Sequence, residues 1–278
     1  LAAHPGGLYL DGLKSLDQAS AAALAKHRGD LSLGGLQALD AAVAEAIAPH
    51  EGGLLLDGLK SVDRPAAVAL AKSTSDLSLG GLTHVDAPVS AALAAHAGSL
   101  ALAAITSLDD TVAKALGEHR GNLSLNGVKS LSPSAAAGLA KCGHGLSLNG
   151  IDKLSPEAAG ILGTHKAPLV LNGLKTLTPQ AADALAKRES GLELGGLTAV
   201  QEPVAAALSK HKGTLILNGV RNLSPTAAES IAAHRGIVIL NGFQSPSAQV
   251  VNILRKNKKI MFPQKVPHEP ERSGQRTK

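Results

Sequence analysis

Pairs of leucines separated by a single residue recur at a constant distance along almost the whole chain. The pairs begin at Leu8, Leu31, Leu54, Leu77, Leu100, Leu123, Leu146, Leu169, Leu192, Leu215 and, with Val in place of Leu, Val238. Each start lies 23 residues after the previous one, with no insertion or deletion in between. The consensus is L-x-L-x-G-L-x-x-L-[S/D]-P-x-A-A-x-A-L-A-x-H-x-G-x. A fixed period of this length indicates a tandem array of one structural unit.

The first half of each unit has the pattern of a short strand. In "LSLNG", residues 123–127, Leu alternates with small or polar residues, which is the period-2 pattern of a half-buried strand. The Gly that follows allows a turn that a side chain would hinder. We therefore expect one short strand per unit, ended by a turn.

The second half of each unit predicts a short helix. Its tenth position reads Asp17, Asp40, Asp63, Asp86, Asp109, Ser132, Ser155, Thr178, Gln201 and Ser224. All of these except Gln201 are residue types that favour an N-cap. Pro follows at once in four units, where its missing N–H costs nothing. An Ala-rich stretch then runs to a Leu or Ile, and Gly beyond it favours a stop.

A unit of one strand and one helix must stack on its neighbours to bury its apolar face. Strands stack about 4.8 Å apart, whereas helices pack about 8 to 10 Å apart, so the stack has to curve. We expect an α/β solenoid with a parallel sheet on the concave side and short Ala-rich helices on the convex side. Ala at one helical position in nearly every unit keeps the helices thin enough to moderate that curvature.

The tandem LxLxGLxxLSPEAAxALAxHxG pattern resembles bacterial leucine-rich-repeat proteins, and the resemblance covers residues 1–242. It departs from the commonest leucine-rich consensus because no Asn stands where an asparagine ladder would run. The Asn residues of this chain, such as Asn126 and Asn149, directly precede the Gly and alternate with Asp and Gly in other units. The resemblance implies a scaffold that binds proteins through the concave sheet and has no catalytic activity of its own.

Composition limits the possible binding surfaces and leaves the compartment open. Aromatic residues make up 1% of the chain, so a large aromatic binding platform is excluded. The single cysteine, Cys142, cannot form an internal disulfide, which fits a cytoplasmic or an exported bacterial protein. The N-terminus has no signal-peptide pattern, and no apolar run is long enough for a membrane helix. Because residues 1–7 fit the tail of a unit and no initial Met is present, we expect a piece of a longer array.

A column of histidines is the most prominent candidate for chemistry. His4, His27, His50, His96, His119, His165, His211 and His234 share one position of the unit. Zinc needs ligands converging at about 2.0 to 2.1 Å, whereas neighbouring helices stand about 8 to 10 Å apart. We therefore favour helix capping, in which the imidazole bonds the last carbonyls and, when protonated, complements the helix dipole. No metal site is predicted.

Two further patterns resemble catalytic or cofactor motifs without meeting their requirements. Gly-x-Lys followed by Ser or Thr recurs, but a phosphate-binding loop needs Gly, Lys and Ser contiguous, and here a core residue separates Gly from Lys. Cys142 stands in the histidine column beside His144 without an oriented base or an oxyanion hole in sight. The sequence thus predicts no catalytic residue, no cofactor and no small-molecule substrate.

The outward positions of the strands are the candidate binding surface. These side chains are mostly small, whereas binding hot spots favour Trp, Tyr and Arg, so a partner would be held weakly or over a large area. The face becomes more apolar toward the C-terminus, although Ile and Val also simply suit strands. The candidate protein-binding residues are Val170, Glu193, Ile216, Ile239, Asn172, Asn218 and Asn241.

The chain changes character after Gly242. Residues 243–260 break the period with an amphipathic segment that we interpret as a capping helix, because a terminal coil must hide its open core. Residues 261–278 form a basic tail, rich in Pro and charge, that we expect to be disordered. Residues 255–278 carry eight basic and two acidic residues, a net of +6 against +5 for the whole chain. The basicity is therefore a property of the C-terminus.

The sequence as a whole favours a non-enzymatic interaction scaffold, expected to be a monomer, that binds an unidentified protein through the concave sheet. An alternative is a structural spacer or cell-surface repeat element, which uniform small side chains would suit. A third class is an electrostatic tether, in which the tail contacts nucleic acid or an anionic membrane. The absence of aromatic stacking residues beyond Phe262 disfavours the nucleic-acid contact.

Overall fold

The computed structural model describes residues 4–244 and 247–263. Within those residues, two-residue strands alternate with helices of seven or eight residues. The strands are β1 (Leu8–Tyr9), β2 (Leu31–Ser32), β3 (Leu54–Leu55), β4 (Leu77–Ser78), β5 (Leu100–Ala101), β6 (Leu123–Ser124), β7 (Leu146–Ser147), β8 (Leu169–Val170), β9 (Leu192–Glu193), β10 (Leu215–Ile216), β11 (Val238–Ile239) and β12 (Ile260–Met261). The helices are α1 (Gln18–Leu24), α2 (Ala41–Ile47), α3 (Arg64–Leu70), α4 (Ala87–Ala94), α5 (Asp110–Leu116), α6 (Pro133–Leu139), α7 (Pro156–Leu162), α8 (Pro179–Leu185), α9 (Glu202–Leu208), α10 (Pro225–Ala232) and α11 (Ala248–Arg255).

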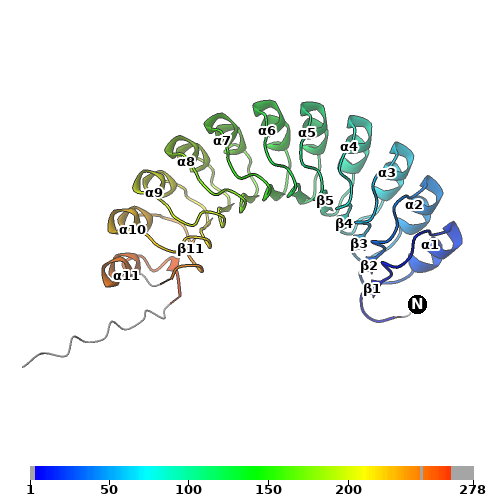
Figure 1. Ribbon diagram of the computed structural model, residues 1–278, viewed down its shortest axis with the longest axis horizontal. Helices are drawn as coiled ribbons and strands as arrows, with labels where there is room; N and C mark the ends of the chain where they lie inside the picture. Colours follow the sequence, from blue (N-terminus) through cyan, green and yellow to red (C-terminus); the bar gives the residue numbers. More distant parts are fainter. Residues whose placement is uncertain (1–3, 245–246, 264–278) are drawn as a thin grey trace, which may run out of the picture.

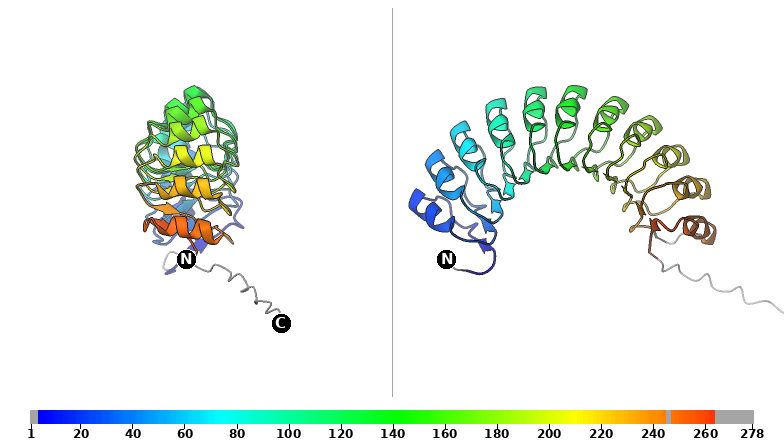
Figure 2. Two further views of the ribbon diagram at one scale, coloured as in Figure 1. Left: turned by 90° about the vertical axis from the view of Figure 1, so that its left-hand side faces the viewer. Right: turned by 180° about the vertical axis from the view of Figure 1, so that it is seen from behind.

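The strands form one parallel sheet in chain order, and the whole array is an arc. Each strand pairs with the next in a register of one unit, as in Leu8 with Leu31 and Leu215 with Val238. The sheet lines the inner side of the arc and the helices line the outer side (Figures 1 and 2). This arrangement confirms the predicted curved α/β solenoid with a concave parallel sheet.

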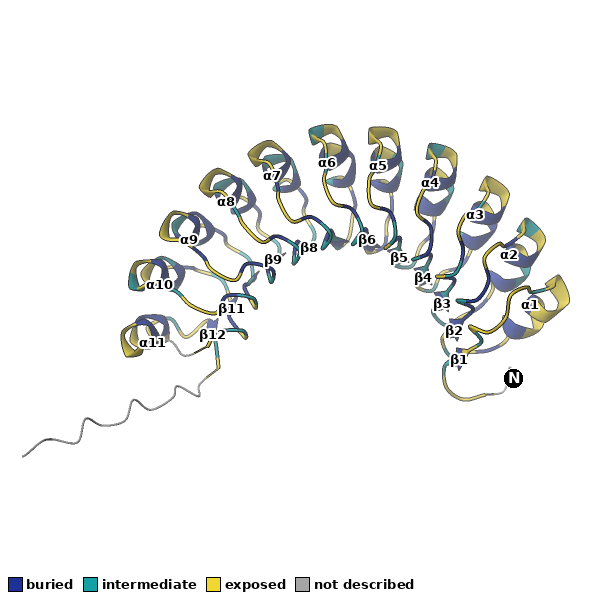
Figure 3. Ribbon diagram, in the orientation of Figure 1, coloured by how far each residue is buried: buried dark blue, intermediate teal, exposed yellow. Residues whose placement is uncertain are grey.

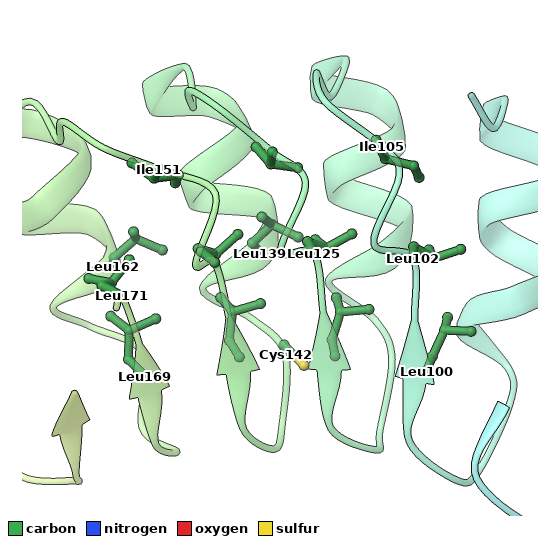
Figure 4. Packing of buried hydrophobic residues seen from close by; sticks show 14 of the residues in the cluster. Leu100, Leu102, Ile105, Leu125, Leu139, Cys142, Ile151, Leu162, Leu169 and Leu171 are labelled. Atoms are coloured by element: carbon green, nitrogen blue, oxygen red, sulfur yellow. The ribbon is translucent and has the colours of Figure 1, made fainter. Parts of the chain in front are cut away.

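A single apolar core runs through the array between the sheet and the helices. In the coil of β2, Leu31, Leu33, Leu36 and Ile47 are fully buried, and equivalent residues repeat this in the other coils. Figure 3 shows the buried residues concentrated between the two layers, and Figure 4 shows such side chains as Leu100 and Leu125 stacked there. Buried Ala residues on the inner faces of the helices let sheet and helix approach closely.

The predicted N-caps are present with one difference. Asp40 Oδ1 accepts the N–H of Val43 at 2.8 Å, and Ser132 Oγ accepts that of Ala135 at 2.9 Å, as expected for the N3 position. Among the described residues, Asp109 shares with Gln201 the lack of a capping hydrogen bond from its side chain. The prediction therefore held for most units and was wrong for the Asp109 side chain.

A ladder of side-chain oxygens, which was not predicted from the sequence, runs along the turns after the strands. The side chain directly before the turn glycine accepts the backbone N–H of the residue one unit later. Asn126 Oδ1 accepts from Asn149 at 3.0 Å, Asn149 from Asn172 at 2.9 Å, and Asp57 from Gly80 at 2.6 Å. The expectation that no asparagine ladder exists was therefore wrong, because Asp and Asn at this position reach from one coil to the next.

A second ladder lies at the other end of the strands, in the residue before each Leu. Asp30 Oδ1 accepts the N–H of Gly53 at 3.0 Å, and Asn122 Oδ1 accepts that of Gly145 at 3.0 Å. A Cβ on Gly53 would stand 2.9 Å from Asp30 Oδ1, so glycine makes room for the carboxylate of the preceding coil. The two ladders satisfy backbone donors at both ends of strands too short to do so themselves.

Removing one rung should destabilise the array measurably. Asn126 Oδ1 also accepts from the Ser147 hydroxyl at 2.7 Å, so Asn126→Ala leaves two donors without their acceptor. We expect a loss of about 1 to 2 kcal/mol in the free energy of unfolding, measured as a lower urea midpoint at constant slope. Asn241→Ala is the matched control, because within residues 4–244 and 247–263 the Asn241 side chain has no hydrogen-bond partner. Equal losses in both variants would contradict a stabilising role for the ladder.

The sequence predicted that the repeat array ends at residue 242. In the structure, one further helix and strand follow that residue. Helix α11 packs with Val250, Ile253 and Leu254 buried, and Ser247 caps it. Strand β12 then pairs in parallel with β11, aligning Ile260 with Val238, one residue short of the full period. The segment 243–260 therefore contributes a helix and the start of another strand, and its role as a cap stays a prediction. The predicted tail beyond residue 263 lies outside the described residues.

Candidate functional site

The concave face is formed by side chains that alternate outward at three positions of each unit: the residue before the strand, the second strand residue, and the residue before the turn glycine. A hollow of about 540 Å³ lies on this face along β3 to β8. Its lining combines leucines of the strands with small residues, which include Gly53, Ser78, Ser124 and Ser147. Curvature and small side chains together leave room there for another molecule.

Over β1 to β11, every charged residue at these three positions is acidic. The residues are Asp11, Asp30, Asp57, Asp76 and Glu193. Asp30 and Asp76 line the hollow itself. The Ser32 hydroxyl, followed by the Gly34 amide, lowers the pKa of Asp11, which keeps that carboxylate ionised. The concave face therefore presents a negative potential to a partner.

The four apolar and acidic candidates lie side by side on consecutive strands. Val170 on β8 aligns with Glu193 on β9, Glu193 with Ile216 on β10, and Ile216 with Ile239 on β11. All four are half-buried. Val170 also lines the hollow, whereas the other three extend the face beyond it.

The asparagine candidates are engaged in the ladder to different degrees. Asn172 Oδ1 accepts the N–H of Gly195 at 2.6 Å while its Nδ2 donates to Glu193 at 3.2 Å. Asn218 Oδ1 accepts the N–H of Asn241 at 3.2 Å. Both polar atoms of the Asn172 side chain are thus hydrogen-bonded within the array. Asn218 and Asn241 are more accessible to a partner, because both residues are exposed.

Sequence reasoning missed the residues before the strands. Asp30, Asp76 and Asn122 line the hollow, although only the second and fourth positions of the unit were considered for binding. The signal was available, because residues two apart in a strand point to the same face. The position before Leu therefore belongs with the other two.

The histidine column is buried and stacked. His27, His50, His96, His119 and His211 are at most 2% exposed. The ring centroids of His96 and His119 lie 6.2 Å apart at an interplanar angle of 8°, and those of His27 and His50 lie 6.0 Å apart at 12°. The rings are closer than the expected helix spacing, because they lie in the loops that lead back to the sheet.

Two imidazoles of the column reach backbone carbonyls of the preceding coil. His234 Nδ1 lies 3.4 Å from the Ser209 oxygen, at the end of α9, and its Nε2 lies 3.1 Å from the Gly213 oxygen. His165 Nδ1 lies 3.4 Å from the Ala140 oxygen at the end of α6. These two rings therefore contact the helix before their own. Neither ring nitrogen has a hydrogen-bond partner in the described structure in His27, His50, His96, His119 and His211.

Burial favours the neutral form of six of these histidines over the protonated form that would complement a helix dipole. Loss of hydration is the main cause that lowers the pKa of His50, His96, His119, His165, His211 and His234 below the usual value. For His50 the neighbouring His27 adds to the effect. Protonation of these six rings to interact with a helix dipole is therefore disfavoured.

Three other residues of the column contact carbonyls of the preceding coil. Cys142 (Figure 4) has its Sγ 3.5 Å from the His119 oxygen, and burial raises the pKa of its thiol, which disfavours a nucleophilic thiolate. The Arg188 guanidinium donates to the Leu162 oxygen at 3.2 Å and to the Ala167 oxygen. Asn257 Nδ2 donates to the Ala232 and His234 oxygens at 3.0 and 2.8 Å. These side chains join successive coils.

Within residues 4–244 and 247–263, no group of three or more His, Cys, Asp or Glu side chains is placed to hold a metal ion. In the same part of the chain, no helix is both long and apolar enough to cross a membrane.

Comparison with solved structures identifies the fold. An internalin from Listeria monocytogenes is similar to this chain with a TM-score of 0.52, at 15% sequence identity, over 91% of this chain and 78% of the internalin. The chain has the leucine-rich-repeat fold. A leucine-rich-repeat protein from Leptospira interrogans is similar at a TM-score of 0.41 and 15% identity, covering 90% of this chain and 81% of the other.

The remaining comparisons add no further relative. No family model matches the sequence, and a search of curated proteins found no match. The leucine-rich-repeat array is therefore interpreted from its own residues: an acidic, hollowed concave sheet, and loops held together by a buried polar column.

Proposed function

We propose that this leucine-rich-repeat array is a non-enzymatic module whose concave sheet binds a segment of another protein. The observation that supports this most directly is the hollow along β3 to β8, because small side chains such as Ser124 and Ser147 keep it open. The parallel sheet is continuous and its strand spacing is fixed, so the face is preformed and binding loses little ordering entropy.

The charges of the face favour a basic partner segment. Asp30 and Asp76 line the hollow, and no basic side chain shares the outward positions of β1 to β11. A segment carrying Lys or Arg gains from this potential, chiefly in association rate and specificity. Because these carboxylates are solvent-exposed, added salt should weaken the complex.

The apolar residues of β9 to β11 extend the same surface. Ile216 and Ile239 stand beside each other at the second strand position, next to Glu193. We propose that they contact an apolar residue of the partner that follows its basic part. Val170 joins the two regions, since it borders the hollow and aligns with Glu193.

A structural spacer is the alternative that the continuous core supports. Buried Leu columns running without a break from β1 to β11 make a stiff element of fixed curvature, which needs no bound partner. The two functions differ in whether the concave surface is specifically occupied.

Arginine substitutions on the two faces separate these functions. Ser147→Arg fills the hollow, Ile216→Arg alters the apolar extension, and Ser134→Arg on the exposed side of α6 is the matched control. Affinity capture from native extract with the full chain should retain a defined protein. We expect Ser147→Arg to reduce its amount about tenfold or more and Ser134→Arg to leave it unchanged.

The outcomes of this capture experiment have distinct meanings. Cross-linking of the retained protein to residues of β3 to β8 would support direct contact. A protein retained equally by all three variants would contradict binding at the concave sheet. Capture of no protein at low or high salt would favour the spacer.

A further inference from the structure

We propose that one flat side of the array, in its C-terminal half, is a docking face for an anionic lipid bilayer. In every coil the chain runs from strand to helix along one flat side of the arc and returns from helix to strand along the other. Because all strands are parallel, every returning loop lies on the same flat side (Figures 1 and 2). This side is called the return face, and in the C-terminal half it comprises the loops before β7 to β12.

The return face carries a dense set of exposed cations. The basic residues of these loops are Lys141, Lys166, Lys187, Lys210, Lys212, Arg235, Lys256, Lys258 and Lys259. All of them are exposed, and Glu189 is the one acidic residue among them in the described part of the chain. Lys210 and Lys212 pair with Asp183 and Glu189 at 2.6 and 3.0 Å, on the surface, where such pairs are weak. Lys259 Nζ donates to the Arg235 backbone oxygen at 2.8 Å. The other six have no ion-pair partner among the described residues.

The cations are concentrated on this part of the molecule. In the N-terminal half, the same loops mix Lys26, Arg28, Lys72 and Arg120 with Glu51 and Glu118. On the opposite flat side of the C-terminal half, the loops after the strands carry fewer cations. They hold Lys129, Lys153, Lys175 and Arg221 together with Asp152, and Glu157 and Glu202 follow in the first turns of α7 and α9. The excess of cations on the return face is therefore a local feature and does not follow from the composition of the chain as a whole.

The shape of the return face and the residue types of its loops favour a bilayer over a linear polyanion. The cations recur at equivalent positions in successive loops, so they form a broad flat field. Such a field suits the surface of an anionic bilayer. Single-stranded nucleic acid requires aromatic residues for stacking, and these loops have none.

Anionic lipids attract such a surface in proportion to its charge. Each Lys or Arg near a charged leaflet contributes a favourable increment, and the attraction falls off within a Debye length. Docking by the return face would leave the concave sheet open at the membrane surface. In this arrangement the loops of the return face make the contact with the lipid, whereas in an electrostatic tether the C-terminal tail makes it.

Vesicle co-sedimentation of the full chain tests the proposal. The chain should sediment with phosphatidylcholine vesicles that contain phosphatidylglycerol and not with phosphatidylcholine alone. The triple variant Lys166→Glu, Lys187→Glu, Arg235→Glu should lower the partition coefficient about a hundredfold. The matched control, Lys129→Glu, Lys153→Glu, Lys175→Glu on the opposite flat side, changes the net charge equally and should retain most of the binding. Circular dichroism checks that both variants are folded.

Three results would overturn the assignment. Equal loss in both triple variants would show an effect of net charge alone. Loss of binding on Lys265→Gln, Arg272→Gln, Arg276→Gln, Lys278→Gln, with the return face intact, would assign the contact to the tail. Tighter binding to double-stranded DNA than to the anionic vesicles at the same salt would replace the bilayer by nucleic acid.

Discussion

Acidification below about pH 6.5 is expected to unfold the array progressively, because its buried histidines are held neutral. In the unfolded chain the six rings whose pKa is lowered by burial regain ordinary values and bind protons more readily. Stability therefore rises with pH between the folded and unfolded pKa values and is lost as pH falls through that window. Within that pH window, each ring changes the free energy of unfolding by up to about 1.4 kcal/mol per pH unit.

Nearby charges modify this effect without reversing it. Asp76 raises the pKa of His96, whereas Arg188 lowers that of His165 and Lys259 lowers that of His234. Because desolvation is the largest cause for all six, protonation remains unfavourable in the folded state. The urea midpoint, followed by far-ultraviolet circular dichroism at a series of pH values, measures the slope.

Asparagine variants isolate the contribution of the column. Asn257 occupies the same position in the last coil and bonds two carbonyls without titrating, so His96→Asn and His119→Asn follow an arrangement that the chain already uses. The double variant should be less stable at neutral pH and lose about a third of the acid slope. His84→Asn with His144→Asn, both on the surface, should leave the slope unchanged. A slope that is the same in both double variants would contradict the assignment.

Gly150→Ala is expected to lower the free energy of unfolding by about 1 to 3 kcal/mol. An added Cβ would stand 2.4 Å from the Val128 oxygen and 2.5 Å from the Asn126 oxygen, so the turns of two coils would have to move apart. Ala104 occupies the same position in another coil, which shows that such a shift is tolerated. The expected cost is therefore strain and not loss of the fold.

Gly12→Ala is the control at the equivalent position. Its Cβ would meet nothing within 4 Å, because no turn of the described chain precedes it. Its stability should change by less than about 1 kcal/mol, and a gain would reflect the reduced entropy of the unfolded chain. Urea denaturation of both variants gives the comparison. If Gly12→Ala lowered the free energy of unfolding as much as Gly150→Ala, the steric explanation would be contradicted.

Features within one unit were predictable from sequence, whereas contacts between units were not. Alternating Leu and N-capping Asp or Ser are local signals, and they placed the strands and helices correctly. The burial of His96 depends on how the loop after α4 packs against the neighbouring coils. Finding histidine at the same position of each repeat does not show that packing. The hollow along β3 to β8 depends on curvature, and the bond from Asn126 to Asn149 depends on the gap between coils. The curvature of the array and the gap between its coils can be obtained only from the folded structure.

The two ladders also define how the array could have grown. In the first coils, an acceptor in one coil faces a glycine or serine in the next: Asp11 faces Gly34, Asp57 faces Gly80, and Asp30 faces Gly53. Deleting residues 31–53 would bring Asp57 directly after Asp11 and Asp76 directly after Asp30, so carboxylates would meet carboxylates. Deleting residues 31–76 would leave Asp11 followed by Gly80. We therefore expect duplication or loss of N-terminal coils to disturb the ladders least when it involves two units at a time.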